Sequence, residues 1–326
     1  MDPQVAAELA AQEGTDEAFV DATFRAILRR DPDGEARERS LAKLADGTLS
    51  RATLVHELAS SEEHIRVREL DDAIALGLGA RSRRERLRWL QAHRADERVI
   101  EIPWVLSRLR TRGRVLEVGY AFAEAAYLAA LLRADVDLVG VDLAAREVEG
   151  METVQADVRA LPFPDRSFEQ VLLVSTLEHV GADNRVYGIE GEPEQDDGTR
   201  EAALRELARV VARDGSLLVT VPLGEPGDHG WFRQDDERGW TSLFARAGCF
   251  VEELESYELG PEGWRAAPSF DAAGVRYGER GPAASAVLCA DLSPGRVRHV
   301  LTPGGLRKAA RRRAARTYRR VRPHDL

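Results

Sequence analysis

The sequence predicts an α/β protein, in which a small all-α domain precedes a mostly parallel sheet of seven strands. Two observations support this prediction. From residue 114 onward, short apolar runs alternate with segments of helical spacing, the pattern of a parallel sheet covered by helices. Residues 16–65 repeat their apolar side chains only at helical spacing. We therefore expect a helical module at 1–65, a helical connector at 66–102, the α/β domain at 103–295 and a basic tail at 296–326.

Composition places the chain among soluble globular proteins. It has 326 residues, of which 44% are hydrophobic and 31% charged. No apolar run approaches the ~20 residues that span a bilayer, and the first residues do not resemble a signal peptide. Cys249 and Cys289 form no metal-ligand spacing and are expected to be core thiols in a reducing compartment. These observations predict a cytoplasmic protein without a metal site.

Charge is distributed unevenly along the chain. The formal net charge is −10, yet residues 296–326 contain eleven basic residues against one acid, Asp325. A basic tail with a weak apolar face predicts peripheral contact with the anionic inner face of a membrane, at about 1 kcal/mol per basic residue. Nucleic acid is a less favoured partner, and a solvated tail is the alternative.

The N-terminal module is expected to contain three short helices. Asp16 is the predicted cap of the first, the turn 31–34 ends it, and Ser50 caps the third. The order of these features over about 50 residues is similar to the small phycobilisome-linker-like helical domain of unknown function. That domain is often attached to bacterial glycosyltransferases and surface-polysaccharide enzymes, so the resemblance implies a docking element in such a pathway.

The connector 66–102 reads as a charged helix, and Pro103 suits the first position of a short helix that leads into the sheet. The glycines at 77 and 79 follow no strand and are not interpreted as a ligand loop. In the α/β domain, helices are expected at 123–133 and 199–212. The expected strands are 115–118, 138–141, 154–156, 171–174, 217–221, 250–257 and 284–290.

Residues 115–143 predict a strand–turn–helix–strand unit that ends in an acid. Asp142 closes the second strand, where a carboxylate can accept from the two hydroxyls of a ribose. A dinucleotide site requires further glycines after Gly119 so that backbone can approach a pyrophosphate. Ala121 and Ala123 stand there instead. The pattern favours a nucleoside cofactor without phosphates, and S-adenosylmethionine fits.

Five ordered motifs over about 110 residues carry a resemblance to a known family. They lie at 115–119, 140–143, 156–165, 174–180 and 206–222. Together they resemble the class I S-adenosylmethionine-dependent methyltransferases of the small-molecule type. The resemblance implies a Rossmann-like sheet with an antiparallel last strand, S-adenosylmethionine as cofactor, and methyl transfer as the activity.

The resemblance also implies which residues hold the cofactor. Asp142 would accept from the ribose hydroxyls, and Leu143 would pack on the adenine. Asp157 would accept from the adenine amino group, and the backbone of Val158 would donate to the ring. The methionine end would be held by the side chain of Glu117 and the turn that follows it, at Gly119, Tyr120 and Ala121.

The first motif departs from the family pattern E-x-G-x-G-x-G. Ala121 and Ala123 replace two glycines, and alanine resists positive φ. Two interpretations follow: the turn is wound differently, or cofactor binding is impaired. The second interpretation leaves open a cofactor-free scaffold or binding protein in a surface-polysaccharide pathway.

Catalysis of methyl transfer needs alignment and, for an alcohol acceptor, a base. The resemblance implies that Ser175 and Thr176 line the floor near the sulfonium. His179, which follows the fourth predicted strand, is the first candidate base, and His229, in the loop after the fifth, is the second. A histidine that only bonds the backbone at a helix start is the alternative for His179.

The acceptor is predicted by exclusion. The segment after the fourth strand lacks the Pro-Pro-aromatic element of amino-methylating nucleic-acid enzymes, and neither cysteine suits a cytosine-C5 nucleophile. We therefore expect O-methylation of a small hydroxylated or sugar/glycan acceptor. A sugar-nucleotide enzyme is disfavoured, because the phosphate glycines and a Tyr-x-x-x-Lys pair are missing.

Overall fold

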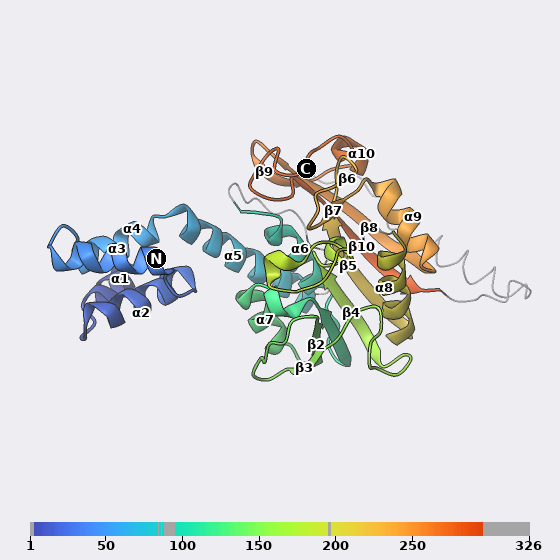
Figure 1. The fold of residues 1–326 in the computed structure, drawn as a ribbon, viewed down its shortest axis with the longest axis horizontal. Coiled ribbons are helices and arrows are strands. Elements are labelled where there is room, and N and C mark those ends of the chain that lie inside the picture. Colours follow the sequence, from blue (N-terminus) through green and yellow to red (C-terminus); the bar gives the residue numbers. More distant parts are fainter. Residues whose placement is uncertain (1–2, 84, 86, 88–94, 195–196, 296–326) are drawn as a thin grey trace, which may run out of the picture. The chain divides into compact units, whose positions relative to one another are not determined.

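A mixed sheet of eight strands forms the centre of the α/β domain, in the order β3-β2-β1-β4-β5-β10-β8-β9 (Figure 1). The computed structural model describes residues 3–295 apart from 84, 86, 88–94 and 195–196. The predicted basic tail, with its membrane contact, lies outside the described residues. The strands are β1 (Arg114–Val118), β2 (Asp137–Asp142), β3 (Glu152–Gln155), β4 (Phe168–Val174), β5 (Val211–Pro222), β8 (Cys249–Gly260), β9 (Gly263–Ala266) and β10 (Ala286–Pro294).

Strands β3, β2, β1, β4 and β5 run parallel, and β10 lies antiparallel between β5 and β8. The strand order reverses between β1 and β4, and at such a point the carboxyl ends of the strands leave a crevice for a ligand. The predicted Rossmann-like class and antiparallel last strand are confirmed. The sheet has eight strands instead of seven, because the short strand β9 turns back on β8 as an edge hairpin.

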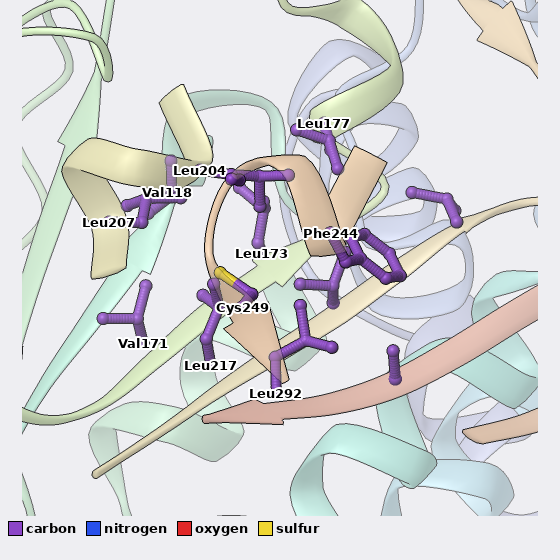
Figure 2. Close-up of a cluster of buried hydrophobic side chains, with 14 of the residues drawn as sticks. Val118, Val171, Leu173, Leu177, Leu204, Leu207, Leu217, Phe244, Cys249 and Leu292 are labelled. Carbon is purple, nitrogen blue, oxygen red and sulfur yellow. The ribbon is translucent and has the colours of Figure 1, made fainter. Parts of the chain in front are cut away.

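Helices cover both faces of the sheet, and β4 divides its side chains between them. Val171 and Leu173 join a cluster with residues of α8 and α9, whereas Leu172 joins a cluster with residues of α6 and α7. This alternation follows the two-residue period of a strand. Figure 2 shows the first cluster, in which Leu204 and Phe244 pack over the sheet. The helices are α6 (Arg98–Arg108), α7 (Ala125–Leu132), α8 (Asp197–Val210), α9 (Glu237–Arg246) and α10 (Ser269–Ala272).

The N-terminal helices enclose a separate apolar cluster centred on Phe19, Val20 and Ile27. Thr15 caps α2, since its side chain accepts from the backbone of Ala18, so the cap lies one residue before the predicted Asp16. The helix α1 was not predicted, because its eight residues carry few large apolar side chains. The helices are α1 (Pro3–Ala10), α2 (Asp16–Leu28), α3 (Gly34–Ala45) and α4 (Arg51–Ala59).

The helix α5 (Glu62–Arg83) crosses the position predicted as the boundary between module and connector. Near its start, His64 Nδ1 lies 2.9 Å from the carbonyl oxygen of Ile27 in α2. Near its end, Gly77 packs so closely on α6 that a Cβ at this glycine would lie 2.7 Å from Pro103 Cα. Gly77 therefore serves the packing of α5 on α6. None of the helices in the described part of the chain could span a membrane.

Candidate active site

A cavity of about 590 Å³ opens at the carboxyl ends of β1, β2 and β4, at the reversal of strand order. The segments that follow these strands and β3 supply most of its lining. Nine of the residues predicted for the site line it: Glu117, Gly119, Asp142, Leu143, Asp157, Val158, Ser175, Thr176 and His179. Residues separated by about 60 positions in the sequence thus surround a single hollow.

The turn after β1 accommodates its alanines without strain. Gly119 has φ 86°, and a Cβ there would overlap the side chain of Thr176, so both backbone and space require glycine. The chain then forms a 3₁₀ turn over Tyr120–Phe122, and Ala123 has φ −68°. No positive φ occurs at Ala121 or Ala123 in this described turn. The turn is therefore wound differently from one that needs glycine at those positions.

Tyr120 and Ala121 were predicted to bind the cofactor, but they are not among the described residues that line the cavity. Both are buried, and the Tyr120 hydroxyl donates to the carbonyl oxygen of Arg146 at 2.5 Å. The amide of Ala121 donates to Asp142 Oδ2 at 3.0 Å, and the amide of Ala144 donates to Oδ1 at 2.8 Å. Two backbone donors thus fix the carboxylate that ends β2, and burial raises its pKa.

Glu117 lies at the end of β1 and is 1% exposed. Its Oε2 accepts a hydrogen bond from the hydroxyl of Tyr127 in α7 at 2.9 Å. Burial raises the pKa of Glu117 to about 8, because the single hydrogen bond does not offset the loss of water. Tyr127 and Glu124 also line the cavity beside it.

Asp157 already has a partner at the adenine end predicted for the cavity. The guanidinium of Arg159 donates to both of its carboxylate oxygens, and Arg159 Nη1 also contacts Glu194 at 2.6 Å. Arg159 therefore lowers the pKa of Asp157. Sequence reasoning assigned no role to Arg159, because arginines are abundant in this chain.

Ser175 occupies a strained position at the end of β4, with φ 42°. Its hydroxyl donates to the carboxylate of Glu101, at 2.8 Å to Oε1 and 2.9 Å to Oε2. Glu101 is fully buried in α6, and its Oε2 also accepts from Arg98 Nη1 at 2.7 Å. The sequence did not indicate these two residues. It placed Pro103 at a helix start, whereas α6 begins at Arg98 and Pro103 lies inside it.

The imidazole of His179 lies in the cavity wall, and its Nδ1 is 2.8 Å from the carbonyl oxygen of Trp231. Since a carbonyl only accepts, Nδ1 carries the proton and Nε2 keeps its lone pair. Burial lowers the pKa of His179 to about 4, so the ring is neutral near pH 7. Tyr187 meets this ring edge-on at 5.5 Å between centroids, and Phe122 lies 4.9 Å from Tyr187.

His229, the second candidate base, is not among the described residues that line the cavity. Its ring stacks on Phe232 at 4.4 Å with an interplanar angle of 2°. The stacking fixes His229 in the loop next to Trp231. The structure therefore brings one of the two predicted histidines to the site. The described residues contain no group of three or more side chains arranged to hold a metal ion.

Comparison with known proteins agrees with this geometry. Residues 116–219 match the family described as methyltransferase domain. This part of the chain is a class I S-adenosylmethionine-dependent methyltransferase domain. Residues 4–67 match the domain of unknown function DUF4214.

Two curated relatives of the methyltransferase domain are ubiquinone/menaquinone biosynthesis C-methyltransferases named UbiE. The protein from Hahella chejuensis is 28% identical over 120 residues, covering 37% of this chain and 41% of its own length. The protein from Xanthomonas campestris pv. campestris is 28% identical over 135 residues, covering 41% of this chain and 46% of its own. The chain thus spans less than half the length of these relatives.

Among solved structures, the chain is similar to a Burkholderia thailandensis 1,6-didemethyltoxoflavin-N1-methyltransferase, described with bound 1,6-didemethyltoxoflavin and S-adenosylhomocysteine. The sequence identity is 15% and the TM-score 0.42, over 88% of this chain and 93% of that one.

Proposed function

We propose that the protein transfers a methyl group from S-adenosylmethionine to a hydroxyl of a small acceptor, with a sugar or glycan as the acceptor class. The observation that supports this most directly is the cavity at the switch point of the sheet. It combines fixed carboxylates at the ends of β1 and β2 with a neutral histidine after β4. The helical module, which resembles domains attached to polysaccharide enzymes, supports the choice of a sugar.

The residues present fit the cofactor. Asp142 would accept from the ribose hydroxyls, since its two amide donors hold the carboxylate in place beside the cavity. Gly119 brings the backbone to the cavity lining without a side chain, and Leu143 offers an apolar surface for the adenine. Glu117 would face the positively charged methionine end. When bound, S-adenosylmethionine supplies an activated methyl group and a thioether leaving group.

His179 is our candidate for the general base. Its Nε2 is unprotonated near pH 7, because burial lowers the pKa and the Trp231 carbonyl fixes the tautomer. The proton of an acceptor hydroxyl would pass to Nε2 as the oxygen bonds to the methyl carbon. A base in this position typically accelerates such a reaction by about 10²–10⁴-fold. Alignment of the acceptor and the methyl group in the cavity would supply the larger part of the rate.

Calorimetric titration with S-adenosylmethionine and S-adenosylhomocysteine tests the cofactor assignment. Micromolar binding is expected, and no binding at millimolar ligand would contradict it. The scaffold alternative is not favoured, because the turn containing Ala121 and Ala123 leaves the cavity open. A scaffold would bind neither ligand.

Labelled cofactor identifies the acceptor atom. The protein is incubated with ¹³C-methyl cofactor and surface glycans from cells that lack it, and the product is analysed by mass spectrometry and NMR. A methyl ether on a sugar is expected. The curated relatives are C-methyltransferases, so a methyl carbon bonded to carbon is the outcome that would overturn the O-methylation proposal.

We further propose that the protein acts in the cytoplasm and that its basic tail contacts the inner face of the membrane. The charge difference between the tail and the acidic remainder supports this contact. Co-sedimentation of the full chain with vesicles should show binding to anionic lipid that is lost at high salt. Equal binding to neutral vesicles would contradict an electrostatic contact.

A further inference from the structure

We propose that Arg98 binds the α-carboxylate of the cofactor's amino-acid end, and that Glu101 positions Arg98 for this task. Both residues belong to α6, which precedes the matched residues 116–219. The inference rests on the proposed cofactor, because it concerns the same cavity. It assigns a ligand contact to a helix outside the matched methyltransferase domain.

The guanidinium of Arg98 is held at one end and lies at the cavity. Arg98 lines the cavity together with Ile102 of the same helix. Its side chain is 31% exposed, and Nη1 is held by Glu101 Oε2 at 2.7 Å. Within the described residues, the guanidinium N–H groups other than Nη1 have no hydrogen-bond partner. Arg98 therefore presents donors to the hollow while one end is fixed.

The described lining of the cavity contains two arginines, and they differ in their partners. Among the described residues that line it, Arg98 and Arg159 are the arginines or lysines. Arg159 already forms ion pairs with Asp157 and Glu194. An anionic group that enters the cavity would therefore find free guanidinium donors at Arg98. Arginine suits a carboxylate, because its planar fork can donate two parallel hydrogen bonds.

The residues around Arg98 suit the amino-acid end of the cofactor. S-adenosylmethionine carries one anionic group, the carboxylate, next to an ammonium group. Glu117 and Glu124 line the cavity and suit the ammonium. Burial raises the pKa of Glu124, and the nearby charge of Arg98 acts in the opposite direction. Arg98 and Glu124 line the same cavity, so a carboxylate on the same carbon as the ammonium would face Arg98.

Glu101 connects Arg98 to Ser175, which lines the cavity. Its carboxylate is 0% exposed and accepts from both Arg98 and the Ser175 hydroxyl. Removing one partner of a buried ion pair leaves an uncompensated charge, so the arrangement is held firmly. Glu101 does not line the cavity, and its role is to fix the guanidinium and the strained Ser175 in one geometry.

The test compares S-adenosylmethionine with decarboxylated S-adenosylmethionine, which keeps the sulfonium and the amine but lacks the carboxylate. Affinities are measured by calorimetry for the full chain and for Arg98→Met and Arg98→Lys. We expect Arg98→Met to weaken binding of S-adenosylmethionine about tenfold or more, the loss of one charge-assisted contact. Its affinity for the decarboxylated compound should stay within about twofold of the unsubstituted protein. Arg98→Lys should retain part of the discrimination.

Arg159→Met is the matched control, since it removes the other arginine of the cavity. It should affect both compounds equally, because both contain adenosine. Thermal unfolding monitors the fold of each variant. Glu101→Gln should also lower the preference for the carboxylated compound, by loosening Arg98.

The remaining outcomes contradict the inference, and the last of them also contradicts the proposed function. If Arg98→Met weakens both compounds equally, or neither, the carboxylate contact is wrong. If it spares the cofactor and weakens an anionic acceptor, Arg98 serves the acceptor instead and the inference is overturned. If the unsubstituted protein binds neither compound, the proposed function fails and the inference with it.

Discussion

The hydroxyl of Tyr127 donates a hydrogen bond to Glu117 Oε2 at 2.9 Å, within the wall of the cavity. Both side chains are buried, and the pKa of Glu117 is raised to about 8. The carboxyl is therefore protonated in much of the free protein at neutral pH. A cationic ligand favours the ionised form, so binding and proton release are coupled.

Binding of S-adenosylmethionine should consequently strengthen as pH rises through about 8, and Glu117→Gln should abolish this dependence. Calorimetry in buffers of different ionisation enthalpy measures the protons released. Tyr127→Phe should shift the dependence to higher pH, because the Tyr127 hydrogen bond lowers the Glu117 pKa. An affinity independent of pH from about 6.5 to 9 would contradict the role of Glu117.

The same pKa has a consequence for stability with the opposite direction. The folded-state value lies above the usual 4.5, so the native protein binds more protons than the unfolded chain between about pH 4.5 and 8. The contribution of Glu117 to the free energy of unfolding is therefore lost as pH rises through that window. Denaturant titrations of the protein and of Glu117→Gln should converge at low pH and diverge towards pH 8, with the variant more stable there.

Gly119→Ala and Ala121→Gly form a matched pair in the turn after β1. Gly119→Ala should destabilise the fold by about 1–3 kcal/mol and abolish cofactor binding, because φ is 86° and Thr176 occupies the space. Ala121→Gly should cost about 1 kcal/mol or less and leave binding intact, since no positive φ occurs at this position. Chemical unfolding and calorimetry measure both. A gain in affinity for Ala121→Gly would show that alanine impairs the site.

Asp142→Asn should weaken S-adenosylhomocysteine binding about tenfold or more, because an amide replaces the charged acceptor for two hydroxyls, worth about 1.5–3 kcal/mol. Asp137→Asn provides the control at the other end of β2, where the side chain is 70% exposed. Its affinity should equal that of the unsubstituted protein. Retention of full affinity by Asp142→Asn would exclude the ribose contact.

His179→Gln should lower the turnover rate by about 10²–10⁴-fold while the affinity for S-adenosylhomocysteine stays the same. His229→Gln is the control, since this ring stacks on Phe232 outside the cavity lining. At saturating cofactor, the rate of the unsubstituted protein should not fall between about pH 8 and 6, because the pKa of His179 is lowered to about 4. Equal rates for both variants would remove His179 from the mechanism.

The parts of the site that sequence reasoning found are those that belong to local motifs. Glu117 and Asp142 lie at the carboxyl ends of their strands and Gly119 directly follows β1, so the carboxyl edge of the sheet brings them together. The alternation of apolar runs with helical segments also predicted a mostly parallel sheet covered by helices. The strand β9 escaped because four residues after a tight turn show no distinct period.

The parts that sequence reasoning missed depend on long-range contacts. Glu101 reaches Ser175 across 74 positions in the chain, and Arg98 belongs to a segment that reads as a solvated helix. His229 lies in the loop that the sequence singled out, but its ring stacks on Phe232 and is not among the described residues that line the cavity. The spacing of residues in a sequence does not determine how such a side chain is oriented.

The conformation of Ser175 bears on any selection of this protein for heat resistance. Ser175→Gly would relax the left-handed backbone, a strain of about 1–3 kcal/mol. The same substitution would remove the hydroxyl donor of the buried Glu101 carboxylate, a hydrogen bond to a charged group worth about 1.5–3 kcal/mol. Because the two effects oppose each other, libraries screened for survival after heating should not become enriched in Ser175→Gly.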